Sequence, residues 1–168
     1  TVDRMGDWII AADDGSRTPF RFLSRNGTGL TSASGTLDYQ GPGRGAGNAI
    51  EVLVATFEVT GDTKFLTEAE KLIRRVIHPH DDIESRNLLD AERRWYYNLF
   101  LQSLGRYLWV KHQHGQHDWM YGYGRACLLH YAKWMIDNEY PYLTKPEILE
   151  YPTETWAAQD MRKCEVFQ

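Results

Sequence analysis

The chain has 168 residues, 42% of them hydrophobic and 25% charged, so it is long and apolar enough to fold around its own core. Its formal net charge of −4 argues against a nucleic-acid platform, because phosphate binding needs a surplus of Lys and Arg on one face. No apolar run approaches the length that spans a bilayer, and no signal-peptide pattern opens the chain.

Both ends of the sequence look interrupted. Thr1 is not an initiator Met, and the last expected helix runs into Phe167 and Gln168 without a Gly cap. We therefore expect residues 1–168 to form a single helical domain that is a fragment of a longer protein. Cys127 and Cys164 fall inside expected helices, which favours buried thiols over a disulfide framework and leaves the compartment open.

The first expected helix is amphipathic and is followed by a long connection. Met5, Trp8, Ile9 and Ala12 follow the i, i+3, i+4, i+7 spacing of a helix with one apolar face. Residues 13–45 are then rich in Gly, Ser, Thr, Asn and Pro. A connection of this length without its own structure is either disordered or functional.

A helical hairpin is expected next. Residues 46–59 are apolar on almost every side, which predicts a helix buried between several neighbours, termed an inner helix. After the turn Thr60-Gly61-Asp62, residues 63–77 place their apolar side chains on one stripe and their charged side chains opposite. This pattern predicts an outer helix with water on one side.

The same alternation continues to the end of the chain. A second long connection, 78–89, leads to Asp90, a good N-cap, and to an inner helix over 91–110. A short connection joins it to a helix over 119–138, which Arg125, Lys133 and Asp137 mark as an outer one. A third long connection, 139–152, delivers the chain to Thr153, a plausible N-cap, and to a last inner helix.

The lengths of the connections predict how the helices are arranged. Short turns join each inner helix to the following outer helix, so these neighbours run antiparallel. The three long connections should then lie together on one face, at the N-terminal ends of the inner helices. The fold class is therefore all-α, built from antiparallel helical hairpins.

The hairpin pattern resembles that of a known superfamily. The residues Thr60-Gly61-Asp62-Thr63-Lys64-Phe65-Leu66 follow an apolar helix. This turn is similar to the inner-to-outer turn of the (α/α) toroid in six-hairpin glycoside hydrolases and polysaccharide lyases. The resemblance implies a closed ring with about twice the number of helices expected in this chain. On that basis the chain is part of an incomplete toroid and is expected to be inactive alone.

The resemblance also implies a carbohydrate cleft on the face of the long connections. That face is expected to carry most of the candidate side chains, which include Asp38, Asn48, Glu92, Tyr151 and Asp160. A glycosidase needs two carboxylates about 5 to 10 Å apart across its cleft. Asp81 or Asp82 together with Glu154 could supply them, although a first-turn acid such as Glu154 also simply favours the helix dipole.

Aromatic and basic side chains complete the expected site. Trp95, Tyr96 and Trp156 could stack on a sugar ring, although tryptophans of inner helices are usually part of the core. Tyr39 lies near the end of the first long connection. Arg44, in Gly41-Pro42-Gly43-Arg44-Gly45, could reach the carboxylate of a uronic acid or pair with a neighbouring acid. We therefore expect a carbohydrate partner of acidic character.

Two groups of histidines raise the question of a metal site. One follows the first hairpin and the other follows the second inner helix: His78, His80, Asp81 and Asp82; and His112, His114 and His117. Their spacings match no established ligand pattern, and the two groups should lie on opposite faces. No metal and no cofactor are expected. His130, inside a helix, is expected to be a hydrogen-bonded core histidine.

Two hypotheses for function follow. The first is part of a carbohydrate-active enzyme, hydrolase or lyase, with its glycan cleft on the face of the long connections. The second is a non-catalytic helical-repeat module that binds a protein or a glycan. In either case the exposed inner helices would be covered by the remaining hairpins of a longer chain or by self-association.

Overall fold

The computed structural model describes residues 1–12 and 42–168, and within these ranges the chain is helical without strands. The α-helices are α1 (Val2–Ala12), α2 (Arg44–Thr60), α3 (Lys64–Val76), α4 (Ala91–Arg94), α5 (Tyr97–Gln113), α6 (Trp119–Asn138) and α7 (Thr155–Val166). Short 3-10 helices lie in the described connections: η2 (Glu84–Arg86), η3 (Tyr142–Thr144) and η4 (Pro146–Ile148). The all-α class expected from the sequence is confirmed for these residues.

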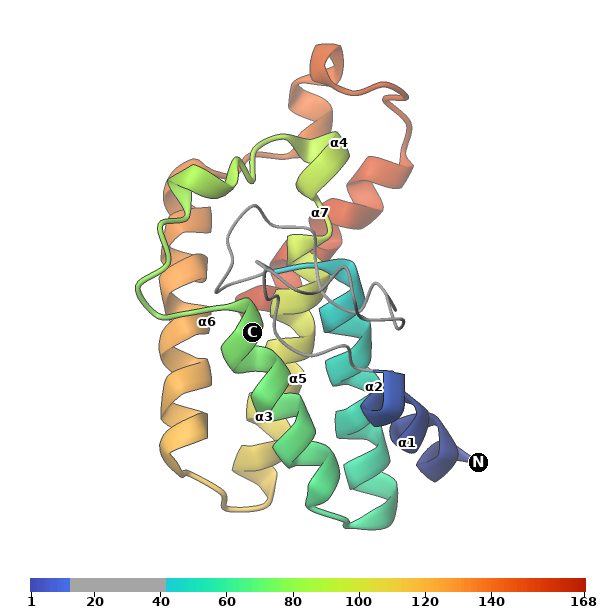
Figure 1. The fold of residues 1–168 in the computed structure, drawn as a ribbon. Coiled ribbons are helices and arrows are strands. Elements are labelled where there is room, and N and C mark those ends of the chain that lie inside the picture. Colours follow the sequence, from blue (N-terminus) through green and yellow to red (C-terminus); the bar gives the residue numbers. More distant parts are fainter. Residues whose placement is uncertain (13–41) are drawn as a thin grey trace, which may run out of the picture.

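The helices alternate in direction as the loop lengths predicted. In Figure 1, α2 and α5 run side by side in the same direction, and α3 and α6 run in the opposite direction. The two short turns lie at the lower end of the view, and the connections 77–90 and 139–154 lie toward the upper end. We name these the short-turn end and the long-connection end. The other long connection is almost wholly outside the described residues.

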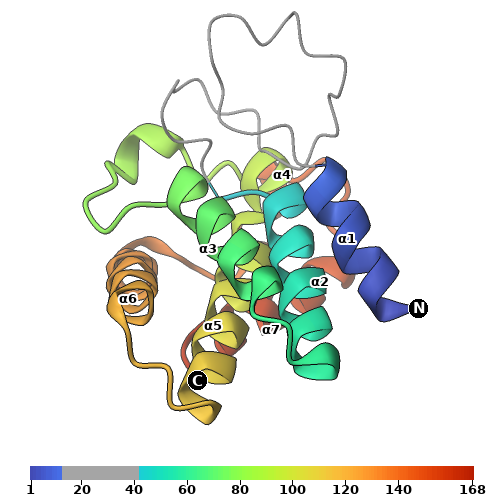
Figure 2. The same cartoon turned by 60° about the horizontal axis from the view of Figure 1, so that its bottom comes forward.

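The core lies between α2, α3, α5 and α6. Figure 2 shows α2 between α1, α3 and α5, which explains why this helix is apolar on several sides. Ala46, Ile50 and Val54 of α2 are fully buried. At Gly47 an added Cβ would lie 3.0 Å from the Phe100 Cα of α5, so the two inner helices approach closely where there is no side chain.

The Thr60-Gly61-Asp62 turn forms as expected and has a local cause. Gly61 adopts a φ of 71°, the left-handed conformation that glycine tolerates, and its N–H donates to the Phe57 carbonyl at 2.7 Å. The Asp62 carboxylate accepts from the Lys64 N–H at 2.9 Å and so satisfies a free donor at the start of α3. Backbone groups at the end of α2 and at the start of α3 are therefore hydrogen-bonded within the turn itself.

The second inner helix is interrupted, although the sequence predicts a continuous helix over 91–110. The backbone of Trp95 and Tyr96 stays in the right-handed helical region. However, the Asn98 N–H donates to the Trp95 carbonyl, an i to i+3 bond that tightens the helix between α4 and α5. Asp90 does precede α4, but its side chain makes no capping hydrogen bond. Trp95, at this break, lines a hollow together with residues of the 151–159 segment.

The two terminal helices are less buried than their patterns predict. In α1, Ile9 is buried but Met5 and Trp8 are 57% and 62% exposed, because α1 crosses its neighbours at Gly6 instead. The last helix begins at Thr155 and not next to Thr153. It buries only Trp156, Lys163 and Val166, so it is an inner helix by direction but not by burial.

The two cysteines also differ. Cys127 is buried, and burial raises the pKa of its thiol to about 12, as expected for an inert core thiol. Cys164 is exposed because it lies on the outward side of α7, so the prediction of a buried thiol was wrong there. None of the helices in the described residues combines the length and hydropathy needed to cross a bilayer.

Candidate functional site

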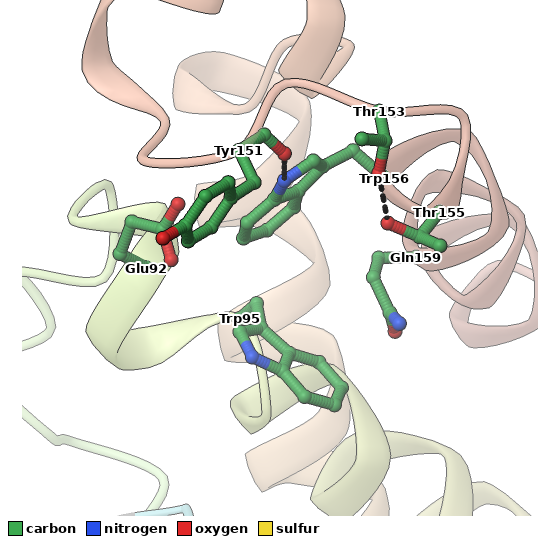
Figure 3. Close-up of a pocket in the computed structure, with 7 residues that line it drawn as sticks. All are labelled: Glu92, Trp95, Tyr151, Thr153, Thr155, Trp156 and Gln159. Atoms are coloured by element: carbon green, nitrogen blue, oxygen red, sulfur yellow. Dashed lines mark hydrogen bonds between the residues drawn. The ribbon is translucent and has the colours of Figure 1, made fainter.

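A hollow with aromatic and polar walls lies at the long-connection end, between α4, the start of α7 and the segment before it. Its volume is about 250 Å³. Seven residues line it (Figure 3): Glu92, Trp95, Tyr151, Thr153, Thr155, Trp156 and Gln159. We call it the Trp95 hollow. Figure 3 shows Glu92 and Tyr151 on one side, Gln159 on the other and Trp95 below.

A small apolar cluster forms the base of the hollow. Ala91, Tyr142, Leu149 and Trp156 are buried together, and Trp95 packs against them. The Trp156 ring meets the Tyr142 ring edge-on, with 5.2 Å between centroids, and its indole N–H donates to the Tyr151 carbonyl at 3.1 Å. Trp156 is therefore fixed in place by packing and by its polar atom.

The polar walls are held by hydrogen bonds of their own. A Glu92 carboxylate oxygen accepts from the Glu150 backbone N–H at 2.7 Å and ties α4 to the 139–154 connection. The hydroxyls of Thr153 and Thr155 are 2.7 Å apart. Tyr151 is different, because it is 71% exposed over the rim of the hollow. The aromatic surface available to a ligand is thus mainly that of Tyr151 and Trp95.

A buried lysine lies on the far side of the apolar cluster. Lys163 Nζ lies 2.7 Å from a Glu139 carboxylate oxygen and 2.9 Å from an Asp160 oxygen, and it donates to the Tyr140 carbonyl at 2.7 Å. The same ammonium lies 3.4 Å from the centroid of the Tyr142 ring. We name this group the Lys163 cluster. It fixes the 139–154 connection onto α7.

Two phenols join the Lys163 cluster to α5. The Tyr97 hydroxyl donates to Glu139, and the Asn98 side chain donates to the Tyr142 hydroxyl at 3.3 Å. Burial, and next the charge of Glu139, raise the pKa of both phenols well above the ordinary value. Both therefore stay neutral at physiological pH and act as hydrogen-bonding supports beneath the hollow.

The structure brings two of the residues predicted to bind substrate into the Trp95 hollow, namely Trp95 and Trp156. Tyr96 lies at the junction of α4 and α5, with its ring centroid 6.3 Å from that of Trp95, but it is not a lining residue. Glu154, a predicted catalytic acid, is exposed next to the lining residues Thr153 and Thr155.

The other two predicted catalytic acids lie elsewhere. Asp81 and Asp82 line a separate hollow of about 420 Å³ against α6, which Glu154 does not line. The side chain of Asp81 is only 5% exposed and pairs with Arg86 at 2.8 Å. Its second oxygen accepts from the Tyr131 hydroxyl at 2.9 Å and from the His78 N–H at 3.1 Å. Asp81 thus anchors the 77–90 connection on α6.

The basic residue predicted to bind substrate does not reach the Trp95 hollow. Arg44 is exposed in the first turn of α2, and no described residue forms an ion pair with it. Tyr39 lies outside the described residues. The role of each in binding stays a prediction.

The histidine groups do not assemble a metal centre in the described part of the chain, where no three His, Cys, Asp or Glu side chains are arranged to hold an ion. His112 and His117 instead bond to each other at 2.8 Å at the short-turn end. The His78 ring accepts from the His80 N–H at 3.1 Å. His130 is half-buried and bonds to the Asp81 carbonyl at 2.8 Å, as a hydrogen-bonded histidine was expected to do.

Two residues at or near the Trp95 hollow could not be identified from the sequence. Gln159 and Lys163 sit within a helix whose pattern offered no reason to single them out. Lys163 is buried because its acidic partners converge on it, and Glu139 lies in a different segment of the chain. Comparison of the chain with protein-family models, curated proteins and solved structures finds no match.

Proposed function

We propose that this chain is part of a carbohydrate-active enzyme, a glycoside hydrolase or polysaccharide lyase, and that the Trp95 hollow belongs to its glycan cleft. The observation that carries the proposal is the makeup of the hollow. Exposed aromatic surface lies beside hydroxyl, amide and carboxylate groups, at the end of the molecule where the long connections meet. The toroid-like alternation of helix directions supports the same proposal.

A sugar ring matches both kinds of surface. Its C–H face is apolar and can pack on the exposed ring of Tyr151 or on Trp95, while its hydroxyls need hydrogen-bond partners around the edge. Thr153, Gln159 and Glu92 supply such partners. A volume of about 250 Å³ lies just below the range of roughly 300–1,000 Å³ that is usual for small-molecule sites, and it suits one ring better than a long chain.

Cleavage of a glycosidic bond requires catalytic groups beyond the residues that line this hollow. Hydrolysis with either stereochemical outcome uses two carboxyl groups flanking the scissile bond. Glu92 is the acid that lines the hollow, and Glu154 lies directly beside it. Glu92 with Glu154 is therefore the pair that we favour at this site, whereas Asp81 or Asp82 acting with Glu154 stays a prediction.

The test is glycan binding by matched aromatic variants. Tyr151→Ala removes an exposed ring with little structural role and should weaken oligosaccharide binding by about tenfold, the loss expected for one aromatic stacking contact. Trp109→Ala is the control, because Trp109 is similarly exposed but lies on α5 away from the hollow. Calorimetric titration of a panel of neutral, amino and acidic oligosaccharides would measure both. Equal binding by both variants, or no binding by the unmodified protein, would overturn the proposal.

A second candidate function is a non-catalytic module that binds a protein partner. The observation that favours it is the exposed apolar surface of α1, where Met5, Trp8 and Ile9 line a hollow of about 430 Å³ with Val52 of α2. Surfaces of this kind mark interaction sites. Trp8→Ala would disrupt such an interaction and leave glycan binding unchanged, so the two candidates are separable.

A further inference from the structure

We infer that the Trp95 hollow prefers a sugar that carries an ammonium group over a neutral sugar, and a neutral sugar over a uronic acid. This inference rests on the proposed function, because it names the class of glycan that the same hollow would take. Its basis is the distribution of charge around the hollow and the hydrogen bonds and ion pairs that the polar groups there already make.

The lining of the hollow carries negative charge without a positive counterpart. Glu92 is the one ionisable acid among the lining residues, and none of the described residues that line the hollow is Lys, Arg or His. One Glu92 oxygen accepts from the Glu150 N–H, and the second has no hydrogen-bond partner among the described residues. That second oxygen is therefore available to a donor on the ligand, and an ammonium group is the strongest such donor.

Two cations near the hollow, Arg162 and Lys163, are engaged by other groups, and Arg93 and Arg94, the neighbours of Glu92 and Trp95 on α4, are not among the lining residues. Arg162 donates through Nε to the Gln159 side-chain oxygen at 2.9 Å and through Nη1 to Gln102 at 3.3 Å. Because its oxygen accepts from Arg162, Gln159 presents neutral amide N–H donors to the hollow. Beneath the base, the Lys163 ammonium is matched by the carboxylates of Glu139 and Asp160.

The rim adds further negative charge. Glu150 and Glu154 are both exposed and are sequence neighbours of the lining residues Tyr151, Thr153 and Thr155. Like charges repel a carboxylate ligand, and the effect is largest where solvent screening is weakest. A uronic acid would thus meet Glu92 and this rim with no lining cation to offset them.

Tyr151 gives the ammonium a second favourable contact. A cation close to the face of an aromatic ring is attracted by the ring's quadrupole, and Tyr151 stands beside Glu92 at the rim (Figure 3). One exposed ion pair and one exposed cation–π contact together correspond to a gain of about threefold to tenfold in affinity. The sequence-based expectation of an acidic glycan depended on Arg44, which is not among the residues lining this hollow.

The experiment compares three oligosaccharides of equal length at about pH 6, where the amine is protonated and the carboxylates are ionised: a glucosamine oligomer, a cello-oligosaccharide and an oligogalacturonate. Calorimetric titration should show the glucosamine oligomer binding about threefold to tenfold more tightly than the neutral one, with the oligogalacturonate weakest. The advantage of the glucosamine oligomer should shrink as salt is raised from about 50 mM to about 500 mM, because salt screens exposed charges.

Glu92→Gln is the matched variant, since it retains the oxygen that accepts from Glu150 and removes the charge. It should abolish the advantage of the amino sugar over the neutral sugar, measured as the ratio of their affinities for the same variant. The salt titration on the unmodified protein gives an independent result if this variant does not fold. An oligogalacturonate that binds best, or an amino sugar without an advantage, would overturn this inference alone. Failure of all three ligands to bind would instead overturn the proposed function.

Discussion

The short-turn end and the long-connection end of this protein each contain a buried lysine held by two acids, and they differ in what is built around it. At the short-turn end, Lys111 lies 2.7 Å from Glu70 and 2.6 Å from Asp118. Asp118 also caps α6 by accepting from the Tyr121 N–H at 3.0 Å. Lys111 thus holds the turn between α5 and α6 next to α3.

At the long-connection end, Lys163 holds a long connection, 139–154, and not a short turn. The Tyr142 ring lies on its ammonium, Trp156 packs on Tyr142, and the Trp95 hollow opens beyond Trp156. The comparison shows that a similar ionic anchor holds a short turn at one end of the fold and, at the other, lies behind the cluster on which the Trp95 hollow is built. The long-connection end is therefore the better place to look for function.

The largest expected effect comes from removing each lysine charge. Lys163→Met leaves Glu139, whose side chain is 7% exposed, as a buried acid without its cation, and should lower the free energy of unfolding by about 3–5 kcal/mol. Lys111→Met should cost less, about 1–3 kcal/mol, because the Asp118 side chain is 54% exposed and water can solvate it. Urea unfolding measures both. Equal losses would contradict the distinction between the two ends.

A smaller effect is expected from Asp81, which the sequence marked as a catalytic candidate. Asp81→Asn removes the charge that faces Arg86 and should lower the free energy of unfolding by about 2–3 kcal/mol, with glycan binding unchanged. Asp82→Asn is the control and should change stability by less than about 0.5 kcal/mol, since Asp82 is exposed. A folded Asp81→Asn protein that had lost glycan binding would contradict this structural role for Asp81.

The smallest effect is a pH dependence at the short-turn end. Burial would raise the pKa of the Asp118 carboxyl, but hydrogen bonds from Lys111 and the Tyr121 N–H outweigh it and hold the pKa below its ordinary value of 3.8. The carboxylate therefore stabilises the fold above pH 3.8, and this contribution is lost as the pH falls through the lower, folded-state pKa. Because the side chain is half exposed, the loss should be no more than about 0.5 kcal/mol.

Urea unfolding at about pH 6 and about pH 3 measures this contribution of Asp118 to stability. In Asp118→Asn the difference in the free energy of unfolding between the two pH values should be smaller than in the unmodified protein, because the titrating group is absent. A difference that is larger in the variant would show that ionised Asp118 destabilises the fold, the opposite of the expected sign.

The hairpins could be predicted from the sequence because their causes are local. The apolar pattern of α2, the Gly61 turn and the polar stripe of α6 each depend on residues within a few turns of one another. Loop lengths alone predicted that the described long connections meet at one end of the molecule. The break at Trp95 was missed, because a helix can tighten there without leaving the helical backbone region.

The site was predictable only in part, for a different reason. Trp95 and Trp156 could be named as aromatic candidates, but their convergence depends on segments that are far apart in the chain. Lys163 could not be identified, because burial of a lysine depends on acids that reach it from other segments. Asp81 was identified as chemically important, and the contacts show it to be an anchor for the 77–90 connection.

The most direct test of the central claim is the response of the tryptophan indole signals in a two-dimensional ¹H–¹⁵N spectrum to a glucosamine oligomer. The chain has six tryptophans; Trp109 and Trp119 lie on either side of the α5–α6 turn, whereas Trp95 and Trp156 line the Trp95 hollow. We expect the indole signals of Trp95 and Trp156 to shift in a saturable manner, while those of Trp109 and Trp119 stay in place. Shifts confined to Trp109 or Trp119, or no shift at any tryptophan, would contradict the assignment of glycan binding to the long-connection end.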